Sequence, residues 1–206
     1  MKRFLFCLLA MLPILVFGKA ISLISEDASS LRLSFEMPEF SLDEIHSGGE
    51  IWQQIQCDEG AYTAEEGYPQ LKMFAVPIAI PIDGDISAVI VSSEQRELAD
   101  VKLLPVPERI LDGDNISYHT RRDFSAYQRA SAYPGQILEV SEPAFIGDRR
   151  FVTLRIFPFR YHAASEKLIV LENIEIAVNI SGTKTNSPNW RFSENPIDQA
   201  GDSFFI

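Results

Sequence analysis

The stretch HSGGEIWQQIQC (46–57) has the residue types of thiol-based catalysis at its two ends. His46 could act as a general base and Cys57 as a nucleophile, provided that imidazole and thiol lie within hydrogen-bond reach. Eleven positions separate them, mostly along one expected strand, which would place them ~33 Å apart in a straight chain. Asp58 and Glu59 follow the cysteine, and their negative charge disfavours a thiolate. We therefore interpret the stretch as a strand beside a turn and expect no catalytic residue in it.

Other residue groups that could do chemistry have equally ordinary interpretations. Asp112, Asp114 and Asn115 resemble the start of a calcium loop, but the downstream glutamate and the flanking helices of that motif are missing. A surface turn is the better interpretation. The three histidines and two cysteines lack the short spacings of metal ligands, and no phosphate-binding glycine loop or nucleophile elbow is present. The sequence predicts neither a metal nor a cofactor.

The first twenty residues have the organisation of a secretory signal peptide. Lys2 and Arg3 precede an apolar run over 4–17, and Gly18 and Ala20 provide small residues for cleavage after Ala20. The run is too short to span a bilayer. We therefore predict a signal peptide at 1–20 and a secreted, extracellular or cell-surface protein.

The charge of the remaining chain restricts its partners. Removal of residues 1–20 takes away three basic residues and no acidic one, which leaves 15 basic and 29 acidic side chains and a net charge of −14. Such a surface repels nucleic acid and anionic membranes, so neither is an expected partner. Cys57 is then the single cysteine, which excludes an intramolecular disulfide.

Residues 21–182 are predicted to form one all-β domain. Short segments of alternating or continuous apolar residues are separated by turn signals, and convincing helices are absent. This pattern is typical of an antiparallel β-sandwich or open barrel. The clearest strand candidates are 31–37, 50–56, 73–82, 86–93, 136–140, 150–159, 167–172 and 174–180.

Prolines and turns refine this prediction. Pro77 and Pro81 predict that 73–82 is an edge strand or an irregular extended segment, because proline cannot donate to a strand ladder. The sequence Asp83-Gly84-Asp85 predicts a hairpin between 73–82 and 86–93. Residues 105–135 contain several turn signals and indicate one long, partly structured surface excursion. The polar segment 183–206 is interpreted as a linker or tail.

Two segments contain sequence motifs in a fixed order. In 48–81, a glycine precedes a strand with one aromatic residue, and a loop leads to Gly-x-Pro-x-Leu and an apolar strand. In 149–180, a strand leads to Pro-x-x-Tyr and a final alternating strand. The residues at these positions are Gly49, Trp52, Gly67, Pro69, Leu71, Pro158 and Tyr161. The pattern, which covers about 48–181, resembles the propeptides of gingipain-type cysteine peptidases.

The resemblance implies a non-catalytic prodomain. Such propeptides are all-β domains that precede a caspase-like catalytic domain, assist its folding and cover its active-site cleft until processing. The expected partner is therefore the catalytic domain of a cognate cysteine peptidase. Arg121 and Arg122 lie in a locally basic part of an acidic chain, which makes them candidates to enter a specificity pocket. The alternative is that these arginines pair with nearby acids such as Asp123.

Two further alternatives stay open at the level of sequence. The chain could be an independent extracellular β-sandwich that binds a protein or a surface polymer. Its residues after Gly182 leave no room for a caspase-like domain, so it could be a truncated precursor or a free-standing prodomain-like protein. The apolar end DSFFI favours truncation before a catalytic domain.

Overall fold

The computed structural model describes residues 20–27, 29–147 and 149–182. The predicted signal peptide, apart from Ala20, and the predicted tail at 183–206 lie outside these residues. The strands in chain order are β1 (Ile21–Glu26), β2 (Ser30–Phe35), β3 (Ser41–Ser47), β4 (Glu50–Gln56), β5 (Ala61–Tyr62), β6 (Lys72–Ala79), β7 (Ile86–Leu98), β8 (Glu108–Asp112), β9 (Asn115–His119), β10 (Leu138–Val140), β11 (Ala144–Ile146), β12 (Arg149–Ile156), β13 (Phe159–His162) and β14 (Lys167–Ile180). One short α-helix, α1 (Phe124–Tyr127), and one 3-10 turn, η1 (Ala163–Ser165), complete the described elements.

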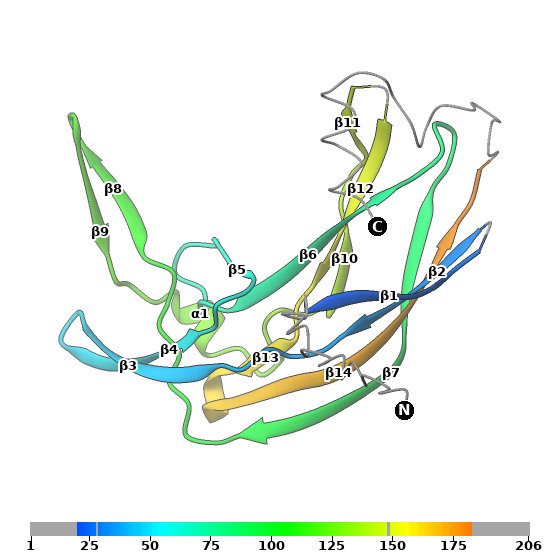
Figure 1. The fold of residues 1–206 in the computed structure, drawn as a ribbon. Helices are drawn as coiled ribbons and strands as arrows, with labels where there is room; N and C mark the ends of the chain where they lie inside the picture. The colour runs from blue at the N-terminus through cyan, green and yellow to red at the C-terminus, as the bar shows by residue number, and fades with distance from the viewer. Residues whose placement is uncertain (1–19, 28, 148, 183–206) are drawn as a thin grey trace, which may run out of the picture.

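Two five-stranded antiparallel sheets form the body of the domain (Figure 1). In the first sheet the order is β1-β2-β14-β13, and β7 also pairs with β14. In the second sheet the order is β10-β12-β6-β5, and β11 also pairs with β12. Two separate hairpins, β3–β4 and β8–β9, extend from this body. The predicted fold class, an all-β antiparallel sandwich, is confirmed.

The main core fills the space between the two sheets. Strands β2 and β14 contribute one wall, and β6 and β12 contribute the other. Their alternating pattern explains this arrangement, since every second side chain of a strand points to the same face. The rings of Phe35 and Phe74 meet edge to face across the core, with centroids 4.9 Å apart.

A second, smaller core lies beside the β3–β4 hairpin. Its fully buried members include Ile55, Leu71, Leu103 and Tyr161. The 14-residue strand β14 takes part in both cores: Leu168 and Val170 belong to the smaller one, whereas residues from Leu171 to Val178 belong to the main one. One continuous strand therefore connects the sandwich to the region around the β3–β4 hairpin.

The predicted hairpin between 73–82 and 86–93 is wrong. The chain does turn at 81–84, where the Gly84 N–H donates to the Pro81 carbonyl at 3.0 Å. However, β6 pairs with β12 and β5, while β7 pairs with β14 in the other sheet. The turn therefore carries the chain from one sheet to the other. The prediction of a sheet edge holds around Pro77, because the described residues of β6 beyond Met73 pair with β12 alone.

The predicted surface excursion at 105–135 contains a hairpin and a helical turn. Strands β8 and β9 form the hairpin, which stands away from the sandwich (Figure 1). Helix α1 follows, and Ala126 and Ala132 return the chain to the body as buried residues. The prediction is therefore correct for the exposed hairpin but misses these packed residues. None of the helices in the described part of the chain has the length and apolar character that a membrane span requires.

Candidate functional site

His46 and Cys57 lie at opposite ends of the β3–β4 hairpin. Gly48 and Gly49 form its turn with φ values of 62° and 79°, so the chain does fold back between the two residues. His46 pairs with Ile51, near the turn, whereas Cys57 follows the far end of β4. Cys57 lies six positions after Ile51 along the extended chain, which corresponds to ~20 Å. The two side chains therefore do not form a catalytic pair.

The acidic residues Asp112 and Asp114 occupy the turn of the β8–β9 hairpin, where Asp112 pairs with Asn115. Gly113 lies between them with a φ of 60°, which explains the glycine in this position. Within the described ranges, no group of three or more His, Cys, Asp or Glu side chains could hold a metal ion. The interpretation of this stretch as a turn is confirmed.

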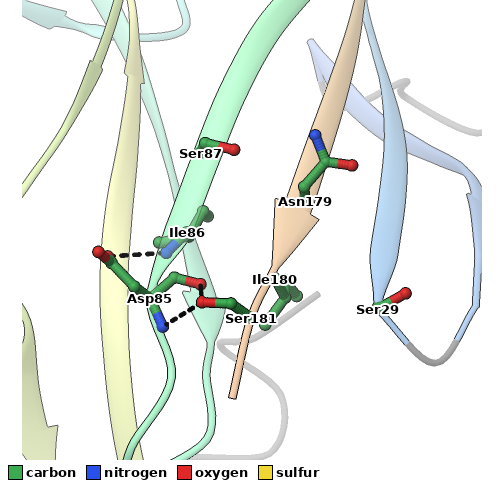
Figure 2. Close-up of a pocket in the computed structure, with 7 residues that line it drawn as sticks. All are labelled: Ser29, Asp85, Ile86, Ser87, Asn179, Ile180 and Ser181. Atoms are coloured by element: carbon green, nitrogen blue, oxygen red, sulfur yellow. Dashed lines mark hydrogen bonds between the residues drawn. The ribbon is translucent and has the colours of Figure 1, made fainter.

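An open pocket of 360 Å³ lies at the C-terminal end of β14 (Figure 2). Its polar groups mainly join β7 to β14: the Asp85 N–H donates to Ser181 Oγ at 3.2 Å, and the Ser181 N–H donates to the Asp85 carbonyl at 2.8 Å. The Asp85 carboxylate accepts the Ile86 N–H at 2.8 Å. These groups are used within the fold, and the pocket holds no arrangement of acid, base and nucleophile.

The segment 119–124, which contains both candidate arginines, lies against the turn of the β3–β4 hairpin. The hydroxyl groups of Thr120 and Ser47 are 2.6 Å apart and form a hydrogen bond. A Cβ atom at Gly48 would lie 3.4 Å from the Thr120 carbonyl oxygen, so the two backbones pass close to each other. The segment is therefore held at Thr120, immediately before the arginines.

Arg122 packs against Trp52, the buried aromatic residue of β4. The guanidinium carbon lies 5.9 Å from the Trp52 ring centroid and 5.7 Å from that of Phe124. One guanidinium nitrogen is 3.9 Å from the Glu50 carboxylate. These contacts leave the Arg122 side chain 38% exposed. Arg122 therefore has an acid partner, as the alternative expects, but this partner is Glu50 rather than Asp123, and the ion pair is long.

Arg121 has a different environment. Its side chain is 79% exposed, and its ion pair with Glu108 is as long as that of Arg122 with Glu50, at 3.9 Å. Such an exposed and distant pair contributes little free energy. The structure thus separates two arginines that are adjacent in sequence: Arg122 is packed, and Arg121 extends into solvent between fixed neighbours.

Asp123 fixes the other side of the segment. Its carboxylate is the N-cap of α1 and accepts hydrogen bonds from the backbone N–H groups of Ser125 at 2.7 Å and Ala126 at 3.1 Å. Hydrogen bonds from the Ser125 side chain and from these backbone groups lower the pKa of Asp123. The backbone N–H of Asp123 donates to the Gly67 carbonyl at 2.9 Å. The segment is therefore held on both sides of Arg121.

Several motif residues form the support beneath this segment. Trp52 is 3% exposed and donates its indole N–H to the Ser47 carbonyl at 3.0 Å. Gly67 has a φ of 79°, and a Cβ atom there would lie 3.1 Å from the Asp123 nitrogen. Glycine is thus required both by backbone conformation and by the close approach of Asp123. Gly49 lies in the turn that carries the contact with Thr120.

Of the other motif residues, Leu71 and Tyr161 belong to the smaller core. Leu71 is fully buried, and Pro69 forms a bridge with Pro105. Tyr161 is 1% exposed and donates its hydroxyl to the Val101 carbonyl at 2.7 Å, and burial raises the pKa of Tyr161 to about 12. The carbonyl of the buried Pro158 accepts the N–H of Leu171 at 2.8 Å. Their roles in the described structure are in packing and backbone pairing.

Sequence reasoning missed the polar residues that complete the support. Lys102 donates to the Glu50 carboxylate at 2.6 Å, and its ammonium lies 4.7 Å from the centroid of the Trp52 ring. The hydrogen bond from Lys102 lowers the pKa of Glu50. Glu50 and Ser47 pair across the turn of the β3–β4 hairpin, whereas Lys102 lies 52 positions after Glu50, and no local motif marks the three residues.

Comparisons with known proteins identify relatives of this chain. The chain is 24% identical over 162 residues to Gingipain R2 of Porphyromonas gingivalis (strain ATCC 33277), which covers 77% of this chain and 22% of that protein. It is 22% identical over 155 residues to Gingipain R1 of Porphyromonas gingivalis, which covers 75% of this chain and 16% of that protein. The chain thus spans at most about a fifth of the length of these relatives.

Two solved structures share the fold. The first is described as "Complex of Porphyromonas gingivalis RgpB pro- and mature domains", with a TM-score of 0.74 at 23% identity over 90% of this chain and 96% of that one. The second is described as "Structural insight into zymogenic latency of gingipain K from Porphyromonas gingivalis", with a TM-score of 0.69 at 20% identity over 79% of this chain and 93% of that one. The Propeptide_C25 family model matches residues 19–198. The chain therefore belongs to the Propeptide_C25 family, the gingipain-type propeptides.

Proposed function

We propose that this protein is the secreted propeptide of a gingipain-like cysteine endopeptidase, and that it binds and inhibits the catalytic domain of that enzyme. The chain itself supplies no catalytic group in this proposal. Family membership and the shared fold with a pro- and mature-domain complex support the choice of partner. The N-terminal sequence supports export through a signal peptide at 1–20.

The environment of Arg121 is the observation that carries the inhibitory role. A segment that occupies a substrate cleft must present a side chain to the specificity pocket and hold its backbone in place. Arg121 is 79% exposed, while Thr120 and Asp123 are hydrogen-bonded to neighbouring parts of the fold. We assign Arg121 to the pocket and Arg122 to the anchoring contact with Trp52. An acidic pocket would bind the Arg121 guanidinium through paired hydrogen bonds.

The same binding would assist folding of the enzyme. A partner that binds the native catalytic domain and not its unfolded form shifts the equilibrium toward the native state. Within one precursor, covalent linkage raises the effective concentration of the propeptide, so modest affinity is sufficient. Processing removes this advantage and permits release.

Alanine variants of Arg121, Arg122 and Arg129, an exposed residue shortly after α1, test the inhibitory role with the purified catalytic domain of the cognate peptidase. We expect Arg121→Ala to weaken inhibition roughly 30-fold or more, as for truncation of one partner in a buried charge pair. Arg122→Ala should weaken inhibition less, because it removes only the contact with Trp52. Arg129→Ala removes the same charge at another exposed position and is the control. Unchanged inhibition in the Arg121→Ala/Arg122→Ala variant would rule out this segment. A wild-type chain that does not inhibit would rule out the function.

The folding role needs a separate measurement. The denatured catalytic domain is refolded with and without an equimolar amount of the secreted chain, and recovered activity is measured after the chain has been removed. We expect a higher yield with the chain present. An equal yield with bovine serum albumin in place of the chain would contradict a specific folding role.

A further inference from the structure

The β8–β9 hairpin has one apolar face that nothing in the described structure covers. The strand register places Leu111 opposite Ile116 and Arg109 opposite Tyr118. Residues that pair directly across two antiparallel strands, and residues two apart along one strand, share a face. Leu111, Ile116 and Tyr118 therefore form one continuous apolar surface with Arg109 at its base, and these three apolar side chains are 64%, 50% and 68% exposed.

The opposite face of the same hairpin is mainly polar. It contains Ile110 among the side chains of Glu108, Asp112, Asn115, Ser117 and His119. Among the described strands, β8 and β9 pair with each other alone, and Figure 1 shows them standing away from both sheets. An isolated two-stranded hairpin is marginally stable in water, and burial of its apolar face against a partner would stabilise it.

We infer that this apolar face docks on the peptidase catalytic domain beside the substrate cleft and extends the contact made by Arg121. The inference rests on the function proposed above. Strand β9 ends at His119, and Arg121 lies three positions after Tyr118, which is about 10 Å of extended chain. A protein surface large enough to receive Arg121 in a cleft therefore lies within reach of the apolar face.

Charge and area favour this partner over a second copy of the chain. The net charge of −11, or −14 without residues 1–20, makes two copies repel each other. Three apolar side chains and one arginine also provide only a few hundred Å² of contact, well below the roughly 1,200 Å² of a specific interface. The face is thus suited to enlarge the interface formed by Arg121. The surface of the catalytic domain that it contacts should be apolar and should offer a hydrogen-bond acceptor to Arg109.

Matched variants of the two faces test the inference. Leu111→Thr/Ile116→Thr replaces two of the three apolar side chains of the face. Ile110→Thr/Ser117→Thr changes the opposite face, and Leu111→Met/Ile116→Val keeps the first face apolar. All three keep residues that are compatible with a strand or with an exposed apolar surface. Each secreted chain is titrated against the cognate catalytic domain by calorimetry, and circular dichroism confirms an unchanged melting temperature.

We expect Leu111→Thr/Ile116→Thr to weaken binding roughly tenfold to 100-fold. The variant of the opposite face and the conservative variant should stay within about threefold of the wild-type affinity. Equal loss from both faces, or no loss from either, would overturn the docking of this face. So would a dimer of the chain alone, seen by sedimentation, that Leu111→Thr/Ile116→Thr dissociates without changing peptidase binding.

The Arg121→Ala variant separates this inference from the proposed function. If the wild-type chain binds and Arg121→Ala weakens it while Leu111→Thr/Ile116→Thr does not, the inhibitor role stands and the docking face is wrong. If the wild-type chain does not bind the catalytic domain at all, the proposed function fails and the inference fails with it.

Discussion

The hydroxyl groups of Ser47 and Thr120 lie 2.6 Å apart and join the β3–β4 hairpin to the residue that precedes Arg121 by one position. Thr120→Val removes this hydrogen bond with little change in shape. We expect inhibition of the cognate peptidase to weaken about three- to tenfold, because the free segment becomes less ordered before binding. The free energy of unfolding should change by less than about 1 kcal/mol, measured by urea denaturation. Ser117→Ala, on the exposed strand β9, is the control, and an equal effect there would exclude a role for the Ser47 contact.

Gly67 and Gly49 provide a matched pair for the support beneath the segment. Both have a φ of 79°. A Cβ atom added at Gly67 would lie 3.1 Å from the Asp123 nitrogen, whereas a Cβ atom added at Gly49 would have no described atom within 4 Å apart from those of its chain neighbours. Both alanine variants therefore carry the strain of a left-handed conformation, about 1 kcal/mol. We expect Gly67→Ala to lose roughly a further 1–2 kcal/mol of unfolding free energy. Equal losses in thermal or urea unfolding would show that the contact with Asp123 relaxes easily.

The buried hydroxyl of Tyr161 holds the 101–103 segment against β13. It donates to the Val101 carbonyl at 2.7 Å, and Tyr161→Phe leaves that carbonyl without its donor. We expect a loss of about 1–3 kcal/mol in the free energy of unfolding, measured by urea denaturation. Tyr118→Phe is the control, since Tyr118 is 68% exposed, and should change the stability by less than about 0.5 kcal/mol. If both variants behave alike, the Tyr161 hydrogen bond does not stabilise the fold.

The segment around Arg121 should loosen in acid. Hydrogen bonds lower the pKa values of both Asp123 and Glu50 below their ordinary values. A depressed pKa means that the stabilisation is fully present only above the ordinary values, 3.8 for Asp123 and 4.5 for Glu50, and is lost as the pH falls from there through the lower folded-state values. We expect the fluorescence of Trp52 to change in this range, followed in a Trp190→Phe background. Glu50→Gln should diminish the transition, and an identical titration in that variant would exclude Glu50 as its source.

Sequence reasoning was sufficient for the fold class and for most strands because local periodicity determines which face of a strand is buried. The partner of a strand is not encoded in this way. The turn at Asp83-Gly84-Asp85 has hairpin chemistry, yet β7 pairs with β14, which follows much later in the chain. The prediction failed because a short turn can also connect two facing sheets.

The candidate site shows the same division between local and distant information. The sequence drew attention to Arg121 and Arg122 by their charge, but it could not distinguish between them. Their difference arises from Trp52 and Glu50, which approach Arg122 only after the β3–β4 hairpin has folded against the segment. The resemblance of the motifs to a known family identified Trp52 and Gly67 as fixed positions, and the structure explains both through their contacts with this segment.

The continuity of β14 has a consequence for how inhibition could end. Because this strand contributes side chains to both cores, we expect the main core and the smaller core to unfold together rather than one after the other. A single backbone break within β14, at a point remote from the cleft, would then disable the inhibitor as completely as a cut beside Arg121. Under the proposed function, proteolytic inactivation of the propeptide would therefore not require access to the segment around Arg121.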